Sequence, residues 1–115
     1  MSLIQPSIGD LLDRLSILKL KIDHGEQADL PVHHFRDEQR EILRILPENW
    51  QNRTDHETTR LFAVNELLWH QTVALREAAR TSAVSIQARL GLSILRMNDE
   101  RAALIEAINT HYGDF

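Results

Sequence analysis

The sequence predicts an all-α fold, with four helices in a bundle-like arrangement and a single domain over residues 1–115. Apolar residues recur at spacings of three and four through most of the chain, and no stretch alternates apolar and polar residues as a strand would. Glycine and proline are scarce, with four and three copies, and most of them lie between the periodic stretches. We expect two shorter N-terminal helices and two long C-terminal helices that form an antiparallel hairpin.

Local signals predict where the helices begin and end. Ser7, followed by Asp10, is typical of an N-terminal capping box, and Gly25 suits the end of the first helix. Pro31 suits the first turn of the second helix. We expect a loop over residues 47–54 that holds a tryptophan folded back on the core. The four helices are predicted over about residues 8–24, 31–46, 54–80 and 82–111.

The first helix is apolar on nearly all sides, because Ile17 and Leu20 lie opposite its main apolar stripe. A helix of this kind is either central to a bundle or shared with a partner. Gly91, on the apolar face of the last helix, would allow another backbone to approach closely. The apolar character of the first helix on nearly all sides predicts a homodimer.

Composition narrows the classes of function. The formal net charge is −4, which favours neither nucleic acid nor an anionic membrane as a partner. The absence of cysteine excludes disulfides and thiolate chemistry. No apolar run approaches the roughly 20 residues of a membrane span, and the N-terminus does not resemble a signal peptide. We therefore expect a cytoplasmic protein that acts without a membrane or nucleic acid.

Polar residues occupy helical faces where apolar ones are expected. Asn65, Trp69, Thr72 and Arg76 share one face of the third predicted helix, and Arg101 shares a face of the fourth with Asn98. Buried polar groups need partners or a function, and a buried arginine must meet an acid, a carbonyl or a bound anion. The candidate network or binding site comprises Asp10, Asp13, Asn65, Trp69, Arg76, Asn98, Asp99 and Arg101.

Three interpretations of these polar residues are open. They can form a structural hydrogen-bond network that fixes helix register, which we favour because such networks are more often structural than catalytic. They can line a ligand pocket. Finally, their long side chains can reach the surface and leave the interior apolar.

Two pairs of acids also have a spacing that suits metal binding. Asp10 and Asp13 lie one turn apart, as do Glu38 and Glu41, and such carboxylates could hold Mg²⁺ against a substrate phosphate. All-helical nucleotide pyrophosphohydrolases use acidic pairs, but their residue types and order differ from those found here. Solvated helix faces carry such pairs as well. We therefore predict no metal site and no cofactor. The catalytic residues are left unassigned, and whether the chain is an enzyme stays open.

A series of ordered motifs gives the chain a resemblance to a known family. Its residues 7–18, SIGDLLDRLSIL, resemble the SIGELIDKLTIL start of the bacterial domain of unknown function 6165 family, with Asp10 in place of the usual glutamate. Its later motifs Val64-Asn65-x-x-Leu68-Trp69, Asn98-Asp99-x-Arg101-Ala102 and Ile108-Asn109 before Gly113 are similar to that family's middle and end. The resemblance implies a small stand-alone cytoplasmic protein, and it carries over no activity. It also implies a protein partner in surface-polysaccharide synthesis.

These observations lead to two hypotheses about function. The first is a non-enzymatic interaction module that forms a homodimer. The alternative is a protein that binds a phosphorylated compound or sugar nucleotide, or hydrolyses a nucleotide with Mg²⁺, in a polar pocket between the first, third and fourth predicted helices.

Overall fold

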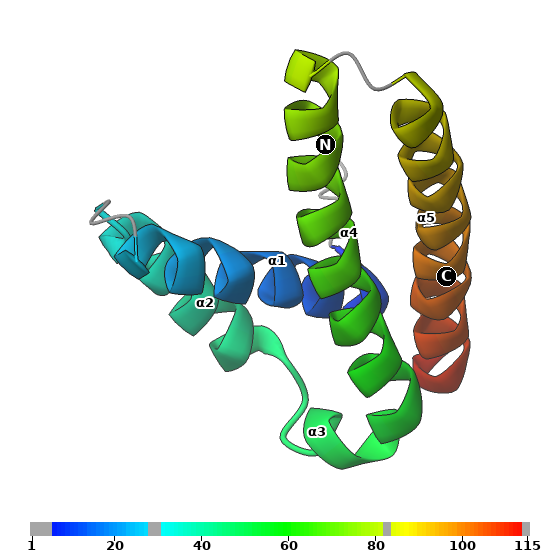
Figure 1. Cartoon of the computed structure of the whole chain (residues 1–115). Helices are drawn as coiled ribbons and strands as arrows, with labels where there is room; N and C mark the ends of the chain where they lie inside the picture. Colours follow the sequence, from blue (N-terminus) through cyan, green and yellow to red (C-terminus); the bar gives the residue numbers. More distant parts are fainter. Residues whose placement is uncertain (1–5, 28–30, 82–83, 114–115) are drawn as a thin grey trace, which may run out of the picture.

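The computed structural model describes residues 6–27, 31–81 and 84–113, and within these ranges every regular element is a helix (Figure 1). The all-α prediction is confirmed. The helices are α1 (Ile8–Gln27), α2 (His33–Ile45), α3 (Trp50–Arg53), α4 (Asp55–Thr81) and α5 (Val84–Tyr112). None of these described helices combines the length and apolarity needed to cross a membrane.

Helix α1 is the centre of the fold. It packs against α2 on one side and against α4 and α5 on the other, and in Figure 1 it lies across the two long helices. Its Leu12 and Leu18 are fully buried in a core that also contains Leu61 of α4 and Ile108 of α5. The apolar character of α1 on several sides is therefore explained within one chain, and it no longer requires a second copy.

The predicted helix boundaries are partly right. Ser7 and Asp10 form the expected capping box, in which the Ser7 hydroxyl donates to Asp10 at 2.8 Å and the Asp10 backbone N–H donates to Ser7 Oγ at 3.1 Å. The end at Gly25 is wrong, because this residue is buried and α1 continues to Gln27. Packing against neighbouring helices stabilises a helix more than the propensity of one glycine weakens it.

The connections on either side of α2 also differ from the prediction. Helix α2 begins at His33 with Val32 as its N-cap residue, so Pro31 lies before the helix and not in its first turn. The loop over residues 47–54 instead contains the short helix α3, which begins at Trp50. The Trp50 side chain packs on the core as expected. The predicted start of the last helix at Ser82 lies outside the described residues.

Helices α1 and α5 cross in close contact at Gly9. A Cβ atom placed on Gly9 would lie 2.6 Å from the carbonyl oxygen of Ile105 and 2.7 Å from Oδ1 of Asn109. The Gly9 backbone N–H donates to that same Asn109 oxygen at 2.7 Å. Only glycine permits this approach, and Asn109 satisfies one of the free N–H groups in the first turn of α1.

Helices α4 and α5 lie side by side along their lengths (Figure 1). Near the start of α4, Arg60 binds Glu100 at 2.5 Å, and further along α4 the Gln71 amide donates to Ser93 at 2.7 Å. Neither α2 nor α3 contacts α5, so residues 67–81 of α4 and 84–97 of α5, here called the distal half, extend beyond the body of the protein. Six exposed large apolar side chains belong to the distal half: Leu67, Val73, Val84, Ile86, Leu92 and Leu95.

Candidate functional site

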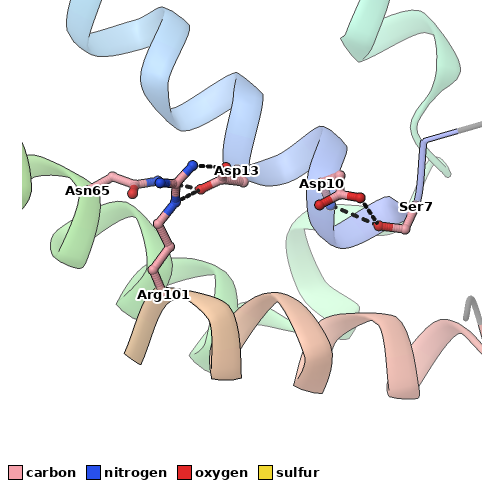
Figure 2. Close-up of polar contacts among 5 residues, drawn as sticks. All are labelled: Ser7, Asp10, Asp13, Asn65 and Arg101. Atoms are coloured by element: carbon pink, nitrogen blue, oxygen red, sulfur yellow. Dashed lines mark hydrogen bonds and ion pairs between the residues drawn. The ribbon is translucent and has the colours of Figure 1, made fainter. Parts of the chain in front are cut away.

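The buried carboxylate of Asp13 joins three helices. Arg101 of α5 binds it with two parallel hydrogen bonds, from Nε to Oδ1 at 2.8 Å and from Nη2 to Oδ2 at 2.5 Å. Asn65 of α4 donates its amide to Oδ1 at 2.9 Å (Figure 2). The Asp13 side chain is 10% exposed and that of Arg101 is 32% exposed. The structure thus brings together three of the residues that the sequence singled out.

The charges of this cluster balance one another. The hydrogen bonds to Asp13 raise the pKa of Arg101 above its usual value, although burial opposes the shift. Both oxygens of the Asp13 carboxylate accept hydrogen bonds, and the two parallel bonds from Arg101 are of the strong bidentate kind. These bonds offset the free-energy cost of removing the carboxylate from water. This arrangement suits a structural network, because it leaves no buried charge without a partner.

The other predicted members lie apart from the cluster. Asp10 is exposed at the start of α1, where it caps the helix with Ser7, as Figure 2 shows. It was expected beside Asp13, but the first turn of α1 lies at the crossing with α5 and not opposite Arg101. Asp99 is exposed on α5. Trp69 is half-buried, and its ring stacks on that of His24 with 4.8 Å between centroids.

A cleft of about 330 Å³ opens beside the Asp13 cluster, between α1, α4 and α5. Its apolar wall consists of Ile17, Leu20, Leu68, Val73 and Ile94. Its polar and aromatic lining consists of Asn65, Trp69, Thr72, Arg76, Asn98 and Arg101. Six of the residues that the sequence placed on polar helical faces therefore line one cleft. Its volume is at the lower end of the range for small-molecule sites.

Arg76 differs from Arg101 in its surroundings. It is exposed, and within the described part of the chain it has no ion pair or hydrogen bond. Of the two arginines, only Arg101 therefore meets an acid among the described residues. No aspartate or glutamate lines the cleft among the described residues.

The two pairs of acids do not converge on a common point. Glu38 accepts hydrogen bonds from Arg14 at 2.5 and 3.0 Å, which lower its pKa, and Glu41 is bound by Arg44. Asp13 is bound by Arg101. Among the described residues no group of three or more histidine, aspartate or glutamate side chains could hold a metal ion. The paired carboxylates act as ion-pair partners, and Arg14–Glu38 links α1 to α2.

Sequence reasoning missed two contacts near the cleft. His24 of α1 stacks on Trp69 of α4, and the periodicity of a single helix gives no sign of this contact. Asn109 caps the start of α1 through Gly9. Its position on the same helical side as Ile105 and Arg101 was a usable signal, since residues four apart share a face.

Comparison with known proteins finds no match to this chain among protein-family models, curated proteins or solved structures. The resemblance to the domain of unknown function 6165 family stays a prediction.

Proposed function

We propose that this protein is a non-enzymatic interaction module that forms a homodimer through α5. The observation that carries the proposal is an exposed stripe along this helix, defined by residues at alternating spacings of four and three. Such spacing is that of a coiled-coil seam. The α5 stripe consists of Val84, Ala88, Gly91, Leu95, Asn98 and Ala102.

Exposure distinguishes the α5 stripe from a core-facing helix surface. Val84 is 75% exposed and Leu95 is 64% exposed. A Cβ atom placed on Gly91 meets nothing within 4 Å, so no neighbouring element in the described part of the chain covers this position. Large apolar side chains at seam positions bind a partner more often than they remain in water.

The total surface of the chain supports a dimer. Its accessible area is 7990 Å², whereas a folded monomer of 13.3 kDa exposes about 6,450 Å². The excess of about 1,500 Å² exceeds the roughly 800 Å² that each partner buries in a standard interface. A second copy would thus bring the exposed area into the usual range.

Side-chain size favours an antiparallel pairing of the two α5 helices around Gly91. Leu95 of one copy would then face Ala88 of the other, and Val84 would face Asn98, so a large residue meets a smaller one at each level.

In this dimer, the antiparallel hairpin of α4 and α5 from each copy would form a four-helix bundle between chains. Among the described helices of one chain, α2 contacts α1 and contacts neither α4 nor α5. The partner in surface-polysaccharide synthesis and the cytoplasmic location remain predictions of the family resemblance.

Light scattering with the variant Leu95→Glu tests the homodimer. We expect the wild type at high micromolar concentration to have twice the 13.3 kDa mass of one chain, and the variant to be monomeric because it places a charge in the seam. Leu43→Glu on α2, where the wild-type residue is 44% exposed, is the matched control and should remain dimeric. A monomeric wild type, or a dimer unaffected by Leu95→Glu, would contradict the proposal.

A further inference from the structure

Beyond the homodimer, we propose that the cleft between α1, α4 and α5 binds a small organic anion. The ligand would place a phosphate or carboxylate group between Arg76 and Arg101 and an apolar or aromatic part against Trp69. All lining residues belong to one chain, and of these only Asn98 also belongs to the α5 stripe.

The hydrogen-bond donors of the cleft form two rows. Thr72 and Arg76 lie one turn apart on α4, and Asn98 and Arg101 lie one turn apart on α5. Arg101 uses Nε and Nη2 to bind Asp13, which leaves its third guanidinium nitrogen, Nη1, without a partner in the described part of the chain. The two helices thus offer several donors to one ligand.

Charge selects an anion over a cation. Arg101 is neutralised by Asp13, but Arg76 has no acidic partner among the described residues. The lining contains two arginines and no carboxylate in that part of the chain, so a positive potential remains in the cleft. Guanidinium groups bind phosphates and carboxylates with two parallel hydrogen bonds where geometry allows.

The remaining wall requires an apolar group on the ligand. Trp69 is held in place by stacking on His24 with 9° between the ring planes, which makes its indole a rigid surface. Val73 and Ile94 complete the apolar side of the cleft. Inorganic phosphate alone would leave this surface in water, so an aromatic phosphate should bind more tightly than phosphate itself.

Titration with phenyl phosphate, inorganic phosphate and phenol tests the site. We expect phenyl phosphate to raise the melting temperature and to shift the indole N–H resonance of Trp69 in NMR spectra, since ligand binding to the folded state stabilises it. Inorganic phosphate should bind more weakly, and phenol should cause neither change. Equal responses to phenol and phenyl phosphate would overturn the assignment of an anion site, as would no response to phenyl phosphate at millimolar concentrations.

The variant Arg76→Gln tests whether the anionic group of the ligand binds beside Arg76. Because Arg76 is exposed and has no contact to lose in the described structure, the variant should melt like the wild type while its affinity for phenyl phosphate falls about tenfold or more. Arg80→Gln, on the same helix and paired with Glu77 at 3.9 Å, is the matched control and should keep the affinity. Equal affinities of the wild type and Arg76→Gln would contradict the proposal.

The variant Leu95→Glu should bind phenyl phosphate as the wild type does, which separates ligand binding in the cleft from formation of the homodimer.

Discussion

At the scale of single residues, the Asp13 cluster shows how a buried charge can be kept in a small protein. Taking a carboxylate out of water costs several kcal/mol, and hydrogen bonds to charged groups each contribute about 1.5–3 kcal/mol in return. Asp13 accepts such bonds from Arg101 and one from Asn65. The cost of desolvation and the gain from hydrogen bonds are similar in size, so the network adds little to the free energy of unfolding. Its main effect is to specify how α1, α4 and α5 meet.

Arg101→Met should lower the free energy of unfolding by about 2–3 kcal/mol, because Asp13 keeps its buried charge and loses its main partner. Adding Asp13→Asn should recover part of this loss, since the remaining buried group is neutral and can still bind Asn65. Urea unfolding of both single variants and the double variant measures the coupling. If the two losses simply add, the cluster does not act as a unit.

At the scale of elements, the position of α1 depends on one close crossing. Gly9 allows the backbone of α1 to meet that of α5 at Ile105, and Asn109 caps α1 at the same point. Gly91, on the same helix α5, has free space around it. The two glycines therefore have different roles. Gly9 is required by the close approach of α1 to α5, whereas Gly91 has no such contact within the described chain.

Gly9→Ala should destabilise the fold by about 1–3 kcal/mol, because the new methyl group would clash with a backbone carbonyl and overpack the crossing. Gly91→Ala is the matched control, and it should stabilise the chain by about 0.5–1 kcal/mol through helix propensity. Thermal unfolding at low protein concentration compares the two free energies without a contribution from association. A Gly9→Ala variant as stable as the wild type would show that α1 does not pack on α5 as described.

At the scale of the whole molecule, the chain divides into a packed body and the distal half of α4 and α5. The body buries the core around α1, whereas the distal half carries most of the exposed large apolar side chains. The radius of gyration of 16.1 Å exceeds the roughly 13 Å typical of a compact domain of this length. Such a division predicts unequal local stability along the same two helices.

Amide hydrogen exchange should therefore be faster in residues 84–95 than in residues 100–110 of α5 at low protein concentration, because few buried contacts protect the distal half. At high protein concentration the homodimer should slow exchange in residues 84–95 and leave residues 100–110 nearly unchanged. Uniform protection along α5 at low concentration would contradict this picture of the fold.

Much of the fold could be predicted from local sequence patterns. Apolar spacing predicted the helices, and Ser7 with Asp10 predicted how the first one begins, because these signals act between residues one turn apart. The same rule placed Asn65, Trp69, Thr72 and Arg76 on one face, and the structure gathers them in one cleft. The end of the first helix predicted from Gly25 and the start of the second predicted from Pro31 were wrong, because packing outweighs weak boundary signals.

The sequence by itself determined which side chains share each helical face, since that depends only on 3.6-residue periodicity. Only the tertiary structure decided that Arg101 binds Asp13, 88 residues away, and not Asp10 or Asp99. The physical reason is that pairs between helices depend on where the helices cross. Here the crossing at Gly9 sets Asp13 opposite Arg101, and it leaves Asp10 at the capped, exposed start of α1 and Arg76 free at the edge of the cleft.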